Sequence, residues 1–284
     1  MLTDLRIYCY DKKKVNDVSA IIKDCSDPSL AWVIERHYAE MIQTFGESIE
    51  DGYMIKVVSS IPDSTFNGVW ATNLNPANVD DKIRETKRFF DSIGNTHWRW
   101  RVTLTSKPSN LGERLEAQGF TRVGEGSPGM AINLSSMKDD FPKPPNFVVK
   151  HVEDSETYKT YLDVLFRSFG FPEAIALAGR DVGLKAGIPS FPPRRAYIGY
   201  LEGKPVATSY LFLRLGVAGI YCVGTLPEAR GKGIGTEMTL APLREAADIG
   251  YKVGILQSTK MGFGVYRRIG FETYCQIVSY KPPV

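Results

Sequence analysis

A glycine-rich stretch, Arg-Gly-Lys-Gly-Ile-Gly at 230–235, constrains the fold of this chain more than any other feature. The segment before it, 218–225, has the β-branched and aromatic residues of a buried strand. After it, apolar residues recur at helical spacing from 237 to 249, and Gly250 follows. A strand therefore turns into a helix through a loop whose glycines let a ligand approach the backbone. The first N–H groups of a helix lack internal partners and the helix dipole is positive there, so we expect a pyrophosphate cradle.

Two common phosphate-binding motifs do not fit this stretch. A Walker loop needs Gly, four residues, Gly, Lys and then Ser or Thr, and that order is absent. The dinucleotide fingerprint fails because Thr236 stands where its third glycine belongs. The pattern that does match is Arg/Gln-x-x-Gly-x-Gly/Ala, at Arg230, Gly233 and Gly235. It resembles motif A of the Gcn5-related N-acetyltransferase (GNAT) superfamily, which binds acyl-coenzyme A. A glycine-rich connection without a ligand is the alternative.

Composition limits the remaining classes. The chain has 284 residues, enough for one or two domains, and its 43% hydrophobic and 24% charged content is that of an ordinary globular protein. A net charge of +3 is too small to indicate nucleic acid or an anionic membrane as a partner. The N-terminus lacks an export pattern and the four cysteines share no metal-ligand spacing, which predicts free thiols, no metal site and a cytoplasmic protein.

The order of predicted elements in the second half is that of an acetyltransferase fold. We expect a strand, two helices, a hairpin with a third strand, a helix, a strand, a helix and a last strand. Their ranges are 147–151, 155–169 (capped by Ser155), a short helix after Pro172, 195–201, 206–215, 218–225, 237–249, 252–257, 261–269 and 273–280. The first half repeats this order in outline, with strands at 5–10, 53–60, 68–74 and 98–104, strands ending at 123 and 134, and helices at 29–46, 78–93 and 109–118.

The two halves also share helix endings, which indicates an internal duplication. Leu115-Glu-Ala-Gln-Gly-Phe120 parallels Tyr266-Arg-Arg-Ile-Gly-Phe271, each with glycine at the helix end. We predict an α/β fold of two tandem acyl-CoA N-acyltransferase-like domains, each a mixed central sheet flanked by helices. A GNAT-like domain at 1–136 is followed by a proline-rich linker at 137–146 and an acetyl-CoA-binding domain at 147–284. The first copy has Asn75-Pro-Ala where the cradle belongs, so we expect it to be degenerate; a binding function of its own stays open.

The resemblance implies a set of cofactor-binding residues. Backbone amides of 231–235 would hold the pyrophosphate, with charge from Arg230 and Lys232. In this superfamily the strand before the cradle splays from its neighbour, and acyl-pantetheine pairs with its exposed main chain. Polar side chains at the end of the following strand would bond the pantetheine amides, unless they simply end the strand without a ligand. The full set is Val223, Gly224, Thr225, Arg230, Gly231, Lys232, Gly233, Ile234, Gly235, Gln257 and Ser258.

Tyr266 and Tyr221 are the candidate catalytic side chains. Many superfamily members place a tyrosine where Tyr266 stands, and the departing thiolate needs a proton donor. Packing on the sheet is the alternative. The strand glutamate used as a base by some members falls at Gly219, so that base is missing. Tyr221, two residues on and on the same face, is a candidate to orient a water, and core packing is the alternative. We interpret Cys222 as a small strand residue rather than a nucleophile.

The remaining predictions concern the acceptor and the first domain. An apolar wall of Phe166, Phe169, Phe171, Pro172 and Tyr197 is expected to form the acceptor site, or else to be core. Trp98 and Trp100 are expected to share one face, buried under their own helices or against the second domain.

The predicted function is transfer of an acetyl group from acetyl-coenzyme A to a small-molecule amine, by direct attack in a ternary complex. A non-catalytic acyl-coenzyme A sensor and a protein or peptide N-acetyltransferase are the alternatives. A homodimer is left open, and no nucleic acid or membrane partner is expected.

Overall fold

The structure is a computed structural model that describes residues 21–189 and 191–283. These residues form two compact units. Unit 1 comprises Ala31–Pro128 and the last segment from Cys275, and unit 2 comprises Gly129–Tyr274 and the residues before Ala31. Among the described residues, the chain passes between the units at the start of α1 (Leu30–Ile42) and within two strands, β5 (Thr121–Asn133) and β11 (Glu272–Lys281). The sequence analysis expected the domain boundary in a linker at 137–146. That segment contains no helix or strand, but it lies wholly within unit 2. The strand expected at 5–10 lies outside the described residues.

Unit 1 is a mixed sheet with helices. Its elements are α1 (Leu30–Ile42), β1 (Glu47–Glu50), β2 (Ile55–Val58), β3 (Gly68–Trp70), α2 (Val79–Ser92), β4 (Arg99–Val102) and α3 (Leu111–Ala117). The strand order is β1-β2-β3-β4-β11-β5, with β3 and β4 parallel. Trp98 stacks on Phe90 of α2 at a centroid distance of 4.2 Å, and both Trp98 and Trp100 are buried. The two tryptophans are therefore core of unit 1, under its own helix.

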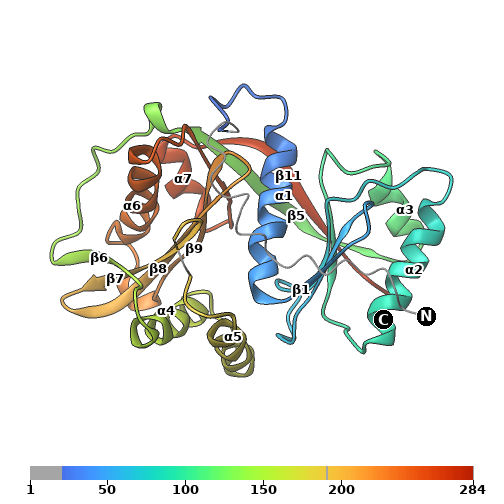
Figure 1. Cartoon of the computed structure of the whole chain (residues 1–284), viewed down its shortest axis with the longest axis horizontal. Coiled ribbons are helices and arrows are strands. Elements are labelled where there is room, and N and C mark those ends of the chain that lie inside the picture. The colour runs from blue at the N-terminus through green and yellow to red at the C-terminus, as the bar shows by residue number, and fades with distance from the viewer. Residues whose placement is uncertain (1–20, 190, 284) are drawn as a thin grey trace. The chain divides into compact units, whose positions relative to one another are not determined.

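The strands of unit 2 continue the same hydrogen-bonded sheet, which has eleven strands over residues 21–189 and 191–283. Its elements are β6 (Phe147–His151), α4 (Ser155–Ser168), α5 (Glu173–Ala186), β7 (Arg194–Leu201), β8 (Lys204–Arg214), β9 (Val217–Thr225), α6 (Ile234–Asp248), β10 (Val253–Gln257) and α7 (Phe263–Ile269). The strand order is β5-β10-β9-β8-β7-β6, and only β9 and β10 are parallel. Figure 1 shows α6 over one face of β8 and β9 and α4 over the other. The predicted order of elements in this half, and the mixed α/β fold class, are confirmed.

Three local differences from the sequence-based prediction have physical reasons. The cap of α4 is Asp154 rather than Ser155, because its carboxylate accepts a 2.8 Å hydrogen bond from the Thr157 N–H in a capping box. Helix α6 begins three residues earlier than predicted, at Ile234, whose side chain is buried in the core. The segment at 121–133 is one strand rather than two.

Helix α5 is longer than the short helix predicted after Pro172, and glycine explains its close packing on α4. A Cβ at Gly179 would meet the ring of Phe166, and one at Gly183 would meet Leu162. Phe166 is thereby buried between the two helices. None of the helices in the described part of the chain is long and apolar enough to cross a membrane.

Candidate active site

Strands β9 and β10 of unit 2 separate after two paired positions. Gly254 pairs with Ala218 and Ile255 pairs with Gly219, and no further pairing between these strands occurs among the described residues. Strand β9 nevertheless continues to Thr225 and β10 to Gln257. The end of β9 therefore borders a gap in the sheet on its β10 side, as the resemblance implied.

A bulge interrupts β9 beside this gap. Thr208 pairs with Gly224 and Tyr210 pairs with Tyr221, so β9 has one residue more than β8 in this interval. Cys222 has φ +53°, a left-handed conformation that non-glycine residues seldom adopt. Burial raises the pKa of the Cys222 thiol to about 12. The thiol is therefore protonated near neutral pH, which argues against a nucleophilic role and agrees with its interpretation as a strand residue.

The loop between β9 and α6 presents consecutive backbone donors. Among the described residues, none accepts a hydrogen bond from the N–H groups of 231–235. Gly231 and Gly233 both have φ +78°, which side-chain-bearing residues rarely adopt. A Cβ at Gly231 or Gly235 would meet no atom within 4 Å, so the backbone at these two glycines is uncrowded. The arrangement has the donors, the helix N-terminus and the room that an anionic group such as pyrophosphate requires.

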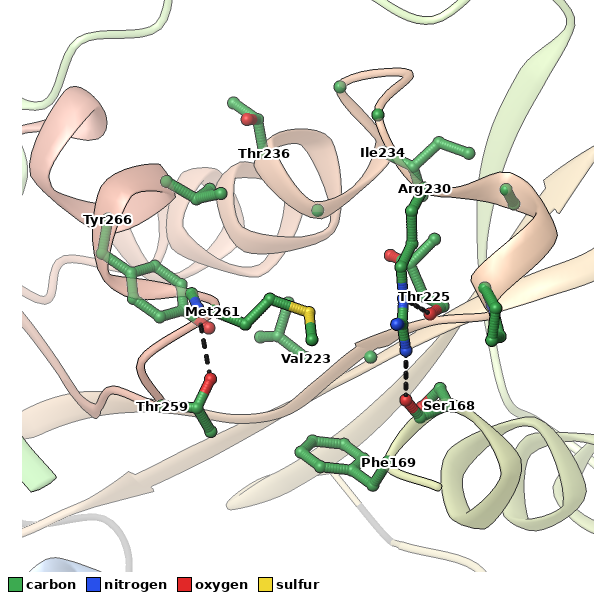
Figure 2. A pocket seen from close by; sticks show the side chains of 18 of the residues that line it. Ser168, Phe169, Val223, Thr225, Arg230, Ile234, Thr236, Thr259, Met261 and Tyr266 are labelled. Carbon is green, nitrogen blue, oxygen red and sulfur yellow. Dashed lines mark hydrogen bonds between the residues drawn. The ribbon is translucent and has the colours of Figure 1, made fainter. Parts of the chain in front are cut away.

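A cavity of about 850 Å³ joins the gap to this loop. It is bordered by the end of β9, the start of α6, the residues after β10 and the end of α4. Figure 2 shows Val223, Met261 and Tyr266 on one side of it and Arg230 on the other. The lining residues are Arg167, Ser168, Phe169, Gly170, Val223, Gly224, Thr225, Pro227, Ala229, Arg230, Gly231, Gly233, Ile234, Gly235, Thr236, Thr259, Lys260, Met261, Gly262, Val265, Tyr266 and Arg268.

Most of the predicted cofactor-binding residues line this cavity, but three do not. Lys232 is exposed beside it, Gln257 is half-buried on β10, and Ser258 is buried with its hydroxyl donating to the Thr259 carbonyl at 2.8 Å. Tyr221 is buried in β9 and is also absent from the lining.

Several residues that line the cavity were not among the predicted site residues. They include the basic Arg167, Lys260 and Arg268, and Met261, which is 72% exposed. Their types carry no motif signal, because only the fold brings the ends of α4, β10 and α7 together.

Of the two predicted catalytic side chains, Tyr266 lines the cavity and Tyr221 does not. Tyr266 lies on α7 and is 8% exposed. Its ring packs edge-on against Phe271 at a centroid distance of 6.0 Å, and no described residue hydrogen-bonds its hydroxyl. Burial raises the pKa of Tyr266 to about 12, so the phenol keeps its proton across the physiological range.

The apolar wall expected at the acceptor side is brought together only in part. Phe169 lines the cavity and is 43% exposed. Tyr197 lies elsewhere: it packs in the core beneath α6, and its hydroxyl donates a 2.8 Å hydrogen bond to Glu245 of that helix. The prediction was wrong for Tyr197 because β7 directs Arg195 and Tyr197 together toward α6, with Glu245 accepting from both. No trio of metal-binding side chains occurs in the described ranges.

The comparable strand end in unit 1 is closed by hydrogen bonds. Here β3 and β4 are parallel, as β9 and β10 are, but the chain beyond them stays paired. Lys107 N–H donates to the Thr72 carbonyl at 2.8 Å, and Leu74 N–H donates to the Lys107 carbonyl at 3.0 Å. The Ala71 N–H donates to the Glu35 carboxylate at 2.9 Å, and the hydroxyl of Thr103 donates to the same carboxylate. Glu35, from α1, thus occupies the end of this strand pair.

The start of α2 also differs from the cradle before α6. The N–H of Ala77 donates to the side chain of Asn75, and the N–H of Asn78 donates to the Asn75 carbonyl. Those donors are used within the loop itself. The absence of a phosphate site at Asn75-Pro-Ala stays a prediction, and these hydrogen bonds add a reason for it.

Comparison with known proteins gives a consistent family. The family described as "Acetyltransferase (GNAT) domain" matches residues 213–274, which contain the bulge, the cradle and Tyr266. The mycothiol acetyltransferase of Thermomonospora curvata is 26% identical over 145 residues, 49% of this chain and 49% of that protein. The mycothiol acetyltransferase of Streptomyces bingchenggensis is 32% identical over 117 residues, 39% of this chain and 37% of that protein. The chain thus matches about half the length of these relatives or less.

Solved structures show the same fold over most of the chain. A GCN5-related N-acetyltransferase from Kribbella flavida has a TM-score of 0.68 and 18% identity, covering 89% of this chain and 96% of that one. A tandem GNAT protein from the clavulanic acid biosynthesis pathway has a TM-score of 0.55 and 13% identity, covering 84% and 82%. The match at 213–274 identifies an acetyltransferase (GNAT) domain in this part of the chain, and the solved structures show the same fold over most of its length.

Proposed function

We propose that this protein is an N-acetyltransferase that transfers an acetyl group from acetyl-coenzyme A to the amine of a small molecule. One observation carries the proposal: a single cavity joins the unpaired amides of 231–235, the gap beside β9 and the Tyr266 hydroxyl. These are three of the groups that acyl transfer from a thioester needs, namely an anion site, main-chain donors and a proton donor.

The pyrophosphate would be held by the backbone amides of 231–235. Arg167, Lys260 and Arg268 at the cavity wall would add positive charge. The proposal assigns no direct phosphate contact to the Arg230 guanidinium, because Arg230 donates to the carbonyls of Thr225 and Ser168. Arg230 would act instead by fixing the loop.

The acyl-pantetheine arm would lie along the end of β9. The Leu226 N–H donates to the Val206 carbonyl of β8, so by the alternation of a strand the N–H groups of Thr225 and Val223 face away from β8, toward the gap. They are the main-chain donors available to amide groups of the arm and to the thioester carbonyl. Donation to that carbonyl would stabilise the negative charge that develops on its oxygen when an amine attacks.

Tyr266 would donate a proton to the departing thiolate. Its phenol is neutral at working pH, its hydroxyl has no partner among the described residues, and it lies in the same cavity. The general base stays unassigned: the lining contains no Asp, Glu or His. Direct attack therefore suits an amine that reaches the site unprotonated or loses its proton to water. Tyr221 stays a proposal for orienting such a water.

A small-molecule acceptor is favoured by the relatives named mycothiol acetyltransferase, which match about half of the chain or less. The lining contains no carboxylate or imidazole that could act as a general base. A non-catalytic acyl-coenzyme A sensor is therefore the second alternative. A peptide acceptor is the third reading and would require an open groove.

One experiment separates these alternatives. The purified chain is incubated with acetyl-coenzyme A and a panel of small amines, amino sugars and peptides, and free thiol release is followed alongside calorimetry of coenzyme A binding. We expect one coenzyme A per chain and thiol release that depends on a small amine. Binding without release for any amine would support the sensor, and release with peptides alone would support the peptide enzyme. Absence of binding would refute the proposal.

A further inference from the structure

The bulge in β9 needs something to hold it, because Cys222 adopts φ +53° without being glycine. A non-glycine residue in this region persists only where the surroundings fix it. The two side chains that fix it come from different elements. Thr208, on β8, donates from its hydroxyl to the Cys222 carbonyl at 2.8 Å. Tyr161, on α4, has its hydroxyl within reach of the Cys222 thiol.

Both side chains are buried, so neither can readily exchange its contact with Cys222 for one with water. Thr208 is fully buried and Tyr161 is 2% exposed. Thr208 stands opposite Gly224, at the last regular pair before the register shifts. The Tyr161 ring stacks on Tyr158 one turn earlier in α4, at a centroid distance of 6.0 Å and an interplanar angle of 15°. Thr208 thus holds the carbonyl of Cys222, and Tyr161 contacts the side chain of the same residue.

The position of the bulge decides which amides face the gap. Main-chain N–H groups alternate along a strand, and an insertion of one residue reverses that alternation beyond it. The residue directly after Cys222 is Val223, whose N–H faces the gap by the alternation counted back from Leu226. Were the extra residue absorbed after Val223 instead, the register of Tyr210 and Tyr221 would continue through this residue and its N–H would face β8. The conformation of Cys222 therefore sets the donor for the thioester carbonyl.

We propose that Thr208 and Tyr161 are positioning residues that hold the Cys222 bulge and thereby aim the Val223 N–H at the thioester carbonyl. This inference rests on the proposed function. It adds to it two residues that line no part of the cavity and touch no substrate. They act through the backbone of β9.

The test combines binding with a spectroscopic signature that does not need an acceptor. Acetyl-coenzyme A labelled with ¹³C at the carbonyl is bound to the full chain, and the carbonyl band is isolated by isotope-edited infrared difference. We expect the wild-type protein to shift this band to lower wavenumber than in water. In Thr208→Val the band should move back toward its solution position. The calorimetric affinity for coenzyme A should stay within about threefold, because the cradle is unchanged, and turnover should fall about tenfold at little-changed KM.

Two further variants separate positioning from general stability. Thr208→Ser keeps the hydroxyl and should restore the band and the turnover. Thr239→Val is the matched control: it removes another fully buried threonine bond of 2.8 Å, to the Gly235 carbonyl inside α6. It should lower the unfolding midpoint comparably and leave the band in place. Tyr161→Phe should shift the band in the same direction as Thr208→Val, by less.

Each contrary result is informative. An unchanged band and turnover in Thr208→Val would overturn the inference, as would an equal change in Thr239→Val. A shifted wild-type band without acetylation of any amine would contradict the proposed enzyme while leaving the positioning role supported. Absence of acetyl-coenzyme A binding by the wild-type chain would overturn both.

Discussion

The Arg230 guanidinium donates a hydrogen bond of 2.9 Å to the main-chain carbonyl of Ser168, the last residue of α4. Its Nε also donates to the Thr225 carbonyl at the end of β9. The side chain that opens the cradle motif therefore connects the strand, the loop and the helix on the opposite face of the sheet (Figure 2). Its forked geometry serves this purpose, because one cation reaches two carbonyls in different directions.

This geometry predicts the behaviour of Arg230→Lys. Lysine keeps the charge but replaces a fork by a single point donor, so at least one of the two carbonyls loses its partner. We expect the free energy of unfolding to fall by less than the roughly 1.5–3 kcal/mol typical of a hydrogen bond to a charged group, because Arg230 is exposed to solvent. Coenzyme A affinity should fall similarly in Arg230→Lys and Arg230→Gln. Urea unfolding and calorimetry check this. If lysine preserved affinity where glutamine lost it, the charge rather than the fork would be the important property.

The cradle predicts that Gly235→Asp abolishes coenzyme A binding without unfolding the protein. A Cβ at Gly235 meets no atom within 4 Å, and an acidic residue in the first turn of α6 suits the helix dipole. The carboxylate would stand in the space assigned to pyrophosphate and repel it. Gly264→Ala, in α7 and also uncrowded, is the control and should bind normally. Calorimetry together with a thermal melt decides: intact binding by a folded Gly235→Asp would place the pyrophosphate elsewhere.

Tyr266→Phe keeps the ring packing on Phe271 and removes the hydroxyl. If proton donation to the leaving thiolate limits the rate, turnover should fall by about 10²-fold while acetyl-coenzyme A affinity changes little. The pKa of about 12 adds a pH prediction. Burial favours the neutral phenol, so the donor stays protonated below that value and is lost only as the pH rises through it. Tyr266 should therefore contribute no fall in rate between pH 7 and 10. Equal turnover in wild type and Tyr266→Phe at every pH would leave the tyrosine a packing residue.

The sequence predicted the features that depend on residues close together in the chain. Glycines that must adopt positive φ mark the cradle directly, and apolar periodicity located the strand and helix on either side of it. The bulge escaped prediction because Cys222 is not a glycine and is held by Thr208 and Tyr161, partners 14 and about 60 residues away. Lys232 was chosen for its charge but does not line the cavity, and the lining cations other than Arg230 come from segments that only the fold assembles.

For unit 1, the sequence offered a local reason to expect no phosphate site, and the structure adds a long-range contact at the strand end. Asn75-Pro-Ala explains the missing cradle, but the strand end itself is filled by Glu35. That residue lies 36 positions from Ala71 and 68 from Thr103. No local pattern records such a contact, because its partners are brought together only when α1 packs on the strands. Its consequence for stability and binding can be measured.

We expect Glu35→Ala to destabilise the protein without creating a second coenzyme A site. Glu35 is 2% exposed and accepts hydrogen bonds from the Ala71 N–H and from the hydroxyls of Thr103 and Thr105. Its removal leaves buried donors unsatisfied, at about 1–3 kcal/mol for such a group, in addition to the lost packing. Glu35→Gln retains one carbonyl acceptor for the N–H, and the threonine hydroxyls can rotate, so it should cost less. Urea unfolding measures the difference, and calorimetry counts the sites. Because the donors at the start of α2 are already used, the stoichiometry should stay at one per chain even when the end of β3 is freed. Two coenzyme A molecules bound by Glu35→Ala would mean that Glu35 alone had been closing a second site.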